Sequence, residues 1–265
     1  MGLRSSFPIL CCLLLLSACG HVEEFRSARL EQATEYNQRA QRAFQRGEYQ
    51  SAATYYENAL LLDVAIENAN GIAINTINLA RVNQVLGNTA LAQSYLDRLL
   101  ADKALNYPAP QLAAAAVQKS LLRLQDNDVT GAMEWVEKAA AYCTSDCAIS
   151  GVIDNARASI FLRMNDADKA LYWGERGAGK NKNTSQLEYA NSLRLGASAK
   201  LLKNAPDAAL RSSEEALVID KLLGLPEKIR QDLLLSAQAH EKLGHADLAA
   251  QYRDRAARIA ATALK

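Results

Sequence analysis

Cysteine is the residue type whose spacing in this 265-residue chain most directly suggests chemistry. Cys143 and Cys147 are separated by Thr-Ser-Asp, in a polar break between two segments with helical periodicity. In an oxidising compartment two such cysteines favour a disulfide, provided that the three intervening residues form a turn. Two free thiols are one alternative. A zinc site is another, and it would need two further ligands from distant parts of the chain.

A second motif suggests phosphate binding. The stretch from Gly174 to Lys180, GERGAGK, matches the G-x-x-x-x-G-K pattern of loops that cradle phosphate groups. That chemistry needs a strand before the loop, a helix after it and a Ser or Thr that contacts magnesium. Here a helical segment precedes the motif, and Asn181 stands where the hydroxyl should be. We therefore interpret the motif as a glycine-rich helix end followed by a basic loop that contains Lys180 and Lys182.

The other titratable residues show no pattern typical of catalysis. His240 and His245 are five residues apart, so they do not share a helix face as a zinc-binding pair would. We expect no catalytic residues, no metal and no cofactor, and we predict that the chain is not an enzyme. With 30 basic and 29 acidic residues the chain is almost neutral, so nucleic acid is not an expected partner.

The N-terminal segment indicates export. An apolar run from Phe7 to Leu16 is too short to cross a bilayer as a helix but suits a signal-peptide core. It ends in Leu-Ser-Ala-Cys19-Gly20, which resembles the lipobox of bacterial lipoproteins. The resemblance implies a signal peptide at residues 1–18, acylation of Cys19, and a short lipidated tether at residues 19–25. Gly20 after the cysteine implies transfer to the outer membrane, with the protein facing the periplasm. An ordinary cleaved signal peptide or an uncleaved anchor is the alternative.

The rest of the chain is organised as a six-fold repeat. A glycine or asparagine suited to a tight turn recurs every 38 to 40 residues, at Gly47, Gly87, Asn127, Asn165, Asn204 and Gly244. A small residue follows each turn after five positions, at Ala52, Ala92, Ala132, Ala170, Ala209 and Ala249. Twelve positions after each turn stand Ala59, Leu99, Ala139, Gly177, Ala216 and Ala256. Small residues at these intervals allow two helices to cross closely.

This pattern resembles the tetratricopeptide repeat (TPR), a helix-turn-helix unit of about 34 residues. The first unit carries the motif as Gly47, Tyr49, Ala52, Tyr56 and Ala59. The period is longer than the family norm by five or six residues, as in the long repeats of kinesin light chains. The resemblance implies an all-α fold, a right-handed α-solenoid of about six repeats over residues 26–265. A generic α-solenoid with a HEAT-like period is the alternative.

The periodicity predicts twelve helices, and Pro108, Pro110, Pro206 and Pro226 mark the first turns of three of them. The predicted ranges are 25–46, 48–63, 69–86, 89–101, 109–126, 129–142, 147–164, 167–177, 184–203, 206–221, 227–243 and 246–263.

The family resemblance also implies a candidate peptide groove, because polar positions of each first helix line the concave face of TPR arrays. In this chain they fall on Asn37, Gln41, Asn78, Arg81, Gln118, Asn155, Ser159, Asn191 and Gln238. An Asn side chain carries both a donor and an acceptor and suits the backbone of an extended peptide. The alternative is that these are merely exposed helix positions. Since only Arg81 is basic, recognition of a terminal carboxylate is not indicated.

The two resemblances together imply a lipid-anchored scaffold or adaptor that faces the periplasm. Its expected partners are proteins or peptides of the cell envelope: assembly machinery, a secretin or cell-wall enzymes. A structural lipoprotein whose groove is filled by its own N-terminal segment is one alternative, and an enzyme is another.

Overall fold

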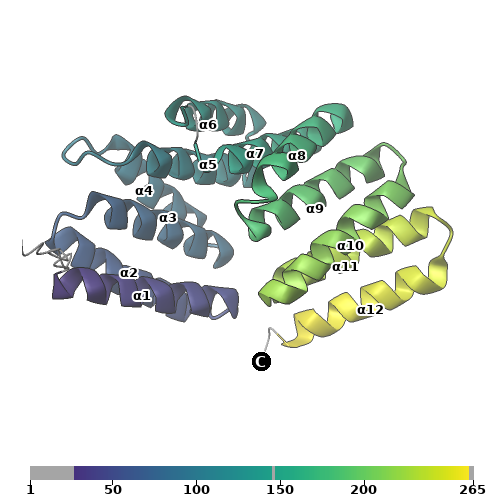
Figure 1. The fold of residues 1–265 in the computed structure, drawn as a ribbon, viewed down its shortest axis with the longest axis horizontal. Helices are drawn as coiled ribbons and strands as arrows, with labels where there is room; N and C mark the ends of the chain where they lie inside the picture. Colours follow the sequence, from purple (N-terminus) through teal and green to yellow (C-terminus); the bar gives the residue numbers. More distant parts are fainter. Residues whose placement is uncertain (1–26, 145–146, 263–265) are drawn as a thin grey trace, which may run out of the picture.

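The computed structural model describes residues 27–144 and 147–262, and this part of the chain contains twelve helices and no strand (Figure 1). The predicted signal peptide, Cys19 and the tether lie outside the described residues. The helices are α1 (Ala28–Gln45), α2 (Tyr49–Ala65), α3 (Ala69–Val85), α4 (Thr89–Ala101), α5 (Ala109–Gln125), α6 (Val129–Tyr142), α7 (Ser150–Arg163), α8 (Ala167–Asn181), α9 (Gln186–Leu202), α10 (Pro206–Leu223), α11 (Pro226–Lys242) and α12 (Ala246–Thr262). The prediction of an all-α array of six helix pairs is confirmed.

The turns within the pairs explain why the sequence repeats. All six predicted turn residues have positive φ: 81° at Gly47, 81° at Gly87 and 80° at Gly244, and between 56° and 62° at the three asparagines. Only Gly, and to a lesser extent Asn, adopts this conformation at low cost. The residue after each turn donates a backbone hydrogen bond to the helix it leaves, as Glu48 N does to Ala43 O at 2.9 Å. Each first helix therefore ends in the same geometry, which directs the second helix back along it.

Small residues determine how closely the two helices of a pair approach. The alanines five positions after the turns are at most 1% exposed, from Ala52 in α2 to Ala249 in α12. Helices that are consecutive in the chain pack on each other throughout the array. The apolar core is correspondingly shared between neighbours; in one cluster Ile77 of α3, Leu96 of α4 and Leu122 of α5 pack together.

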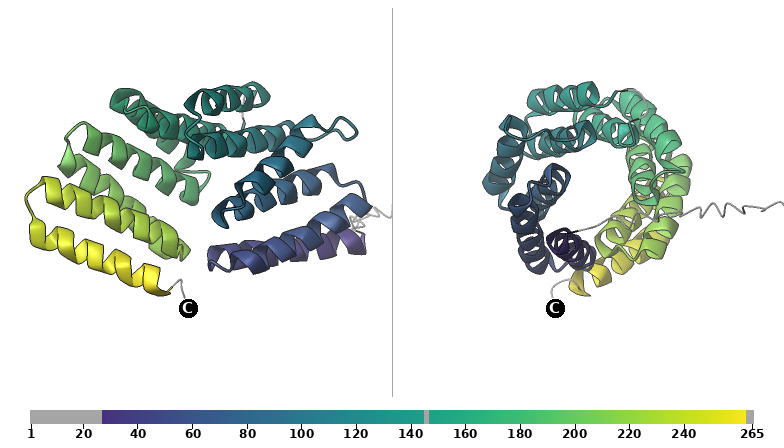
Figure 2. Two further views of the ribbon diagram at one scale, coloured as in Figure 1. Left: turned by 180° about the vertical axis from the view of Figure 1, so that it is seen from behind. Right: turned by 60° about the vertical axis from the view of Figure 1, so that its left-hand side comes forward.

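The array is curved, with the first helix of each pair on the inside. Each first helix (α1, α3, α5, α7, α9, α11) contacts the next first helix, whereas the described second helices make no such contacts with one another. Seen along the array, the helices form a ring that is almost complete (Figure 2). In Figures 1 and 2 the turn between α1 and α2 lies opposite the turn between α10 and α11. These two ends make no helix-to-helix contact.

Most helix ends differ from the predicted ones by one to three residues, and two of the differences concern the motifs singled out in the sequence. α7 begins at Ser150 and not at 147, after the cysteine-containing break. α8 continues to Asn181, so the glycine-rich stretch and Lys180 are helical, and Lys180 does not lie in a loop. No helix among the described residues has the length and apolarity needed to cross a membrane.

Candidate peptide-binding groove

The nine predicted groove residues lie on the six first helices, which line the concave face of the array. Proximity to the groove does not make their polar groups available to a partner. The structure divides them into residues whose side chains are bonded within the chain and residues whose side chains have no partner.

Asn37 and Gln41 on α1 belong to the first group. Asn37 Nδ2 donates to Asn75 Oδ1 at 2.6 Å, and Asn75 Nδ2 donates to Asp63 Oδ2 at 2.7 Å. Gln41 Nε2 donates to Asn37 Oδ1 at 3.1 Å. Asp63 is 2% exposed, and burial raises its pKa although hydrogen bonds from Asn68 and Asn75 oppose the shift. These amides stabilise a buried carboxylate at the junction between the first two repeats.

Asn155, Ser159 and Asn191 are bonded in a second network. Asn155 Nδ2 donates to Glu188 O at 3.1 Å, and Asn155 Oδ1 accepts from Ser192 Oγ at 2.7 Å. Asn191 Nδ2 donates to Glu188 Oε2 at 3.1 Å, and Ser159 Oγ donates to the Asn155 carbonyl at 3.0 Å. This network joins α7 to α9 and occupies both ends of the Asn155 amide.

Gln118 on α5 is also bonded. It is 4% exposed, and its Nε2 donates to Gln84 Oε1 at 2.6 Å. Gln84 in turn donates to Gln125 Oε1 at 2.6 Å. This chain of amides links α3 to α5.

Asn78, Arg81 and Gln238 form the second group, since none of them makes a side-chain hydrogen bond or ion pair with another described residue. Asn78 and Arg81 are three residues apart and share one face of α3. Burial raises the pKa of the neighbouring Tyr56 to about 12, and the charge of Arg81 opposes that shift. Gln238 of α11 lines a depression of about 530 Å³ whose floor includes Leu162 of α7 and Leu201 of α9.

An ion cluster that the sequence did not predict lies beside the groove. Arg194 Nη1 of α9 contacts Asp220 Oδ2 of α10 and lies 3.0 Å from Asp232 Oδ1 of α11. Both aspartates are fully buried. Burial, and a hydrogen bond with Asp220, raise the pKa of Asp232 to about 7, although Arg194 opposes the shift. The sequence did contain a signal for this buried polar position. Asp63, Asn181 and Asp220 are all buried, and each stands four residues after the second small residue of its repeat.

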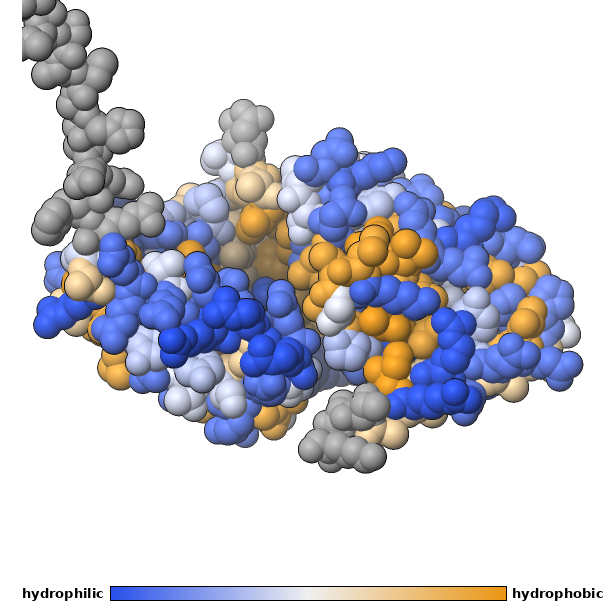
Figure 3. Space-filling model, turned by 60° about the horizontal axis from the view of Figure 1, so that its bottom comes forward, coloured by the Kyte–Doolittle hydropathy of each residue, from blue (hydrophilic) through white to orange (hydrophobic). Residues whose placement is uncertain are grey.

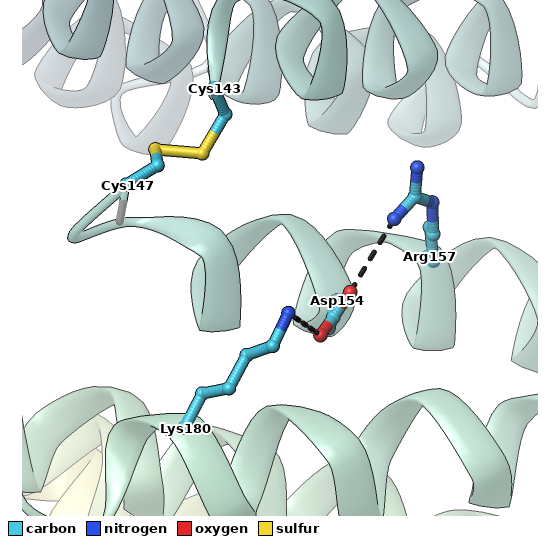
Figure 4. Close-up of a disulfide and its surroundings, with 5 residues drawn as sticks. All are labelled: Cys143, Cys147, Asp154, Arg157 and Lys180. Atoms are coloured by element: carbon cyan, nitrogen blue, oxygen red, sulfur yellow. Dashed lines mark hydrogen bonds and ion pairs between the residues drawn. A yellow bond between two sulfur atoms is a disulfide. The ribbon is translucent and has the colours of Figure 1, made fainter. Parts of the chain in front are cut away.

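Figure 4 shows the disulfide at the N-terminal end of α7 and a buried carboxylate further along the same helix. The sulfur atoms of Cys143 and Cys147 are bonded, with their Cα atoms 5.3 Å apart. Asp154 is 1% exposed and lies 2.7 Å from Lys180 Nζ and 3.4 Å from Arg157 Nη1. Arg176 Nε lies 3.3 Å from the same carboxylate. These contacts link α7 to α8 and neutralise the buried charge.

The described residues contain no group of three or more His, Cys, Asp or Glu side chains that could hold a metal ion. His240 and His245 lie near each other, with Nδ1 atoms 3.4 Å apart, on opposite sides of the last turn between paired helices.

Comparisons with known proteins agree with this architecture. No model of a protein family and no curated protein matches the chain. The structure of BtubC (BKLC) from P. vanneervenii is 18% identical, covers 89% of this chain and 92% of its own, and superposes with a TM-score of 0.57. A Rap protein, solved in complex with competence and sporulation factor, is 16% identical with a TM-score of 0.71; the match covers 90% of this chain and 66% of Rap. PilW, described as a widely conserved type IV pilus biogenesis factor, is 17% identical with a TM-score of 0.57, covering 84% of this chain and 91% of PilW.

All three structures are TPR-like helical-repeat proteins. This chain therefore has the fold of a TPR-like helical-repeat protein, an α-solenoid of six helix pairs. Because the sequence identities are only 16 to 18%, these comparisons show a similarity of fold and nothing more.

Proposed function

We propose that this chain is a periplasm-facing scaffold or adaptor, anchored by lipid to the outer membrane, whose concave face binds a protein or peptide during assembly of envelope, secretion or pilus machinery. The observation that carries the proposal is the set of partner-free polar side chains on the concave face, Asn78 and Arg81 of α3 and Gln238 of α11. A polar side chain that stabilises nothing within the fold is available to a partner.

The chemistry of these groups suits a peptide. The primary amides of Asn78 and Gln238 each offer donors and an acceptor, the complement of a backbone peptide group. An extended segment has many such groups unpaired, and TPR-like arrays present a long concave surface to it. The Rap structure, solved with a bound factor, and the pilus biogenesis factor PilW are consistent with this type of role.

The location rests on the sequence. The segment ending in Ala18-Cys19-Gly20 has the spacing of a lipobox, and several acyl chains would give stable anchoring where one would be marginal. A disulfide such as Cys143–Cys147 suits an oxidising compartment outside the cytoplasm.

A groove variant tests the binding role. We expect Asn78→Ala, Arg81→Ala and Gln238→Ala together to abolish photo-cross-linking to envelope proteins in intact cells, while the thermal melting curve stays unchanged. Arg211→Ala, an exposed residue of α10 that pairs with no other described residue, is the matched control. Cross-linking by the triple variant at the level of the unmodified chain would refute binding by this face.

A second experiment tests the anchor. Metabolic labelling with an acyl-chain analogue should be lost in Cys19→Ala, and the protein should leave the membrane fraction. Labelling that persists in the variant would refute lipidation at this residue.

A further inference from the structure

The two halves of the array carry charged residues that are far apart in the sequence but face the same gap between the halves. Lys228 lies in the first turn of α11, in the sixth repeat, and Arg81 lies near the C-terminal end of α3, in the second. In Figure 1 the C-terminal end of α3 and the N-terminal end of α11 lie on opposite sides of the gap between the ribbons of the two halves. The space-filling view in Figure 3 shows a hollow between these halves, which we call the opening. The electrostatics agree: burial is the largest cause of the lowered pKa of Lys228 and of the raised pKa of Tyr49 in α2, and the charge of Arg81 adds to the first shift and the charge of Glu227 to the second.

Neither Arg81 nor Lys228 has a counter-ion among the described residues. The charges of Glu188 and Asp220 raise the pKa of Lys228, but neither group forms an ion pair with it, and the acidic groups of this region are bonded to other residues. Glu227 forms a two-pronged ion pair with Arg230 at 2.7 and 2.8 Å. Glu188 accepts hydrogen bonds from the two asparagines described above, and Asp220 is paired with Arg194. The opening therefore presents two unpaired cations.

Lys228 is only partly exposed, which makes its missing counter-ion more costly than that of a lysine in open solvent. Burial is the largest cause of its lowered pKa, and the charge of Arg194 is the second. An anion bound at this point would remove the penalty. The N-terminal end of α11 would add a further attraction for negative charge.

The same hairpin carries exposed apolar side chains. Leu222 is 83% exposed and Leu223 is 42% exposed, in the turn that leads from α10 into α11. Four residues before Leu222, on the same side of α10, Val218 is 58% exposed. Figure 3 shows apolar side chains gathered on the C-terminal half of the molecule, beside the hollow that separates the two halves. Large exposed apolar groups at such a place are typical of an interaction surface.

We propose that this opening binds a segment of a partner protein in which an acidic side chain is flanked by apolar ones. The carboxylate lies between Arg81 and Lys228, and the apolar side chains pack on Leu222 and its neighbours. This inference rests on the proposed function and specifies the chemistry of the partner. Because the two cations belong to opposite halves of the array, the ligand connects repeats whose described helices make no contact with one another.

A peptide library provides a probe that does not require the natural partner. The full chain is panned against random dodecapeptides displayed on phage, and the selected peptides are synthesised with each Asp or Glu kept or replaced by Asn or Gln. We expect the selected peptides to be enriched in an acidic residue with apolar neighbours. Replacing the acidic residue should weaken binding about tenfold or more in fluorescence anisotropy, since a partly buried charged hydrogen bond is lost.

Protein variants complete a double-mutant cycle. Lys228→Gln and Arg81→Gln should each lower the affinity for the acidic peptide by a similar factor. The affinity for the peptide in which the acid is replaced by an amide should be the same for Lys228→Gln and for the unmodified chain. Arg211→Gln should bind like the unmodified chain.

Peptides that bind but lack acidic residues, or that bind Lys228→Gln as tightly as the unmodified chain, would overturn this inference. If the triple alanine variant of Asn78, Arg81 and Gln238 did not bind these peptides, the proposal that the concave face binds a partner would still hold. If light scattering showed that the unmodified chain self-associates and that Lys228→Gln does not, the opening would bind a second copy of the chain. That result would also overturn the inference. A library that yields no binding peptide would overturn the inference and the groove proposal together.

Discussion

Asp232→Asn should make the stability of this chain less dependent on pH. Asp232 and Asp220 are fully buried and share the charge of Arg194. One oxygen of each aspartate, Asp232 Oδ2 and Asp220 Oδ1, accepts no hydrogen bond from any described residue. A hydrogen bond between two carboxyl groups needs a proton on one of them. This requirement explains why the hydrogen bond with Asp220 contributes to raising the pKa of Asp232 to about 7.

The sign of the effect follows from proton binding. The unfolded aspartate loses its proton near its ordinary value of 3.8, whereas the folded one keeps it up to about 7. Between these values the folded state binds more protons, so the free energy of unfolding falls as pH rises. From pH 5 to pH 8 the loss attributable to this group is about 2–3 kcal/mol. Asparagine has no proton to lose in this pH range. Its side-chain amide can still accept a hydrogen bond from Arg194 and donate one to Asp220.

The assay is urea denaturation followed by circular dichroism at several pH values from 5 to 8. The free energy of unfolding of the unmodified chain should fall by about 2–3 kcal/mol more than that of Asp232→Asn over that range. Since repeat arrays can unfold in stages, amide hydrogen exchange in α9, α10 and α11 should locate the difference. Glu134→Gln, which removes an exposed carboxylate on α6 that has no described partner, is the control and should follow the unmodified chain.

Two outcomes would refute this reasoning. Parallel pH profiles for the unmodified chain and Asp232→Asn would mean that Arg194 keeps both carboxylates ionised. A variant that is less stable than the unmodified chain at pH 8 would mean that the second negative charge stabilises the cluster.

Three further predictions concern packing, hydrogen bonding and the disulfide. Gly177→Ala should lower the free energy of unfolding by about 1–3 kcal/mol, because the new Cβ would lie 2.5 Å from Asn155 Oδ1. Gly179, two residues further along the same helix, has open space around it, so Gly179→Ala should raise the free energy of unfolding by up to about 1 kcal/mol. Equal effects of the two substitutions would contradict the prediction that the new methyl group at residue 177 is too close to Asn155. Asn155→Ala should cost about 1–3 kcal/mol in urea denaturation, since the buried Ser192 Oγ and the partly buried carbonyl of Glu188 each lose one of their partners. Replacing Cys143 and Cys147 together by Ser should cost about 2 kcal/mol, the effect of releasing a five-residue loop. Free thiols in the unfolded, unreduced chain would show that no disulfide had formed.

The fold could be predicted because its determinants are local and repeated. A Gly or Asn at the turn and a small residue five positions later depend only on backbone conformation and on the space between two adjacent helices. The six turns from Gly47 to Gly244 all have the expected positive φ. The less regular breaks between helices were harder to predict. Glu67 has a positive φ of 50°, although it is neither glycine nor asparagine.

The candidate site could be predicted only in part, because helical spacing tells which face a side chain is on and not what it contacts. Asn78 and Asn155 both occur on first helices at positions expected to face the groove. Asn78 has no described partner, whereas Asn155 is bonded to Glu188 and Ser192, which belong to the next repeat. The pairing of Arg194 with Asp220 and Asp232 likewise joins residues 26 and 38 positions apart.

The same reasoning explains where function can reside in such an array. Positions that repeat, such as the buried alanines, are constrained by packing and are equivalent in every unit. Lys228 stands sixteen residues before its turn, where the second and fifth repeats have Gly71 and Glu188. A positive charge that occurs at this position in one repeat only cannot be a requirement of the helix pair, since the other pairs form without it. Arg81, on the other side of the opening, likewise forms no ion pair with a described residue, so these two cations are the ones that our proposal assigns to the binding of a partner.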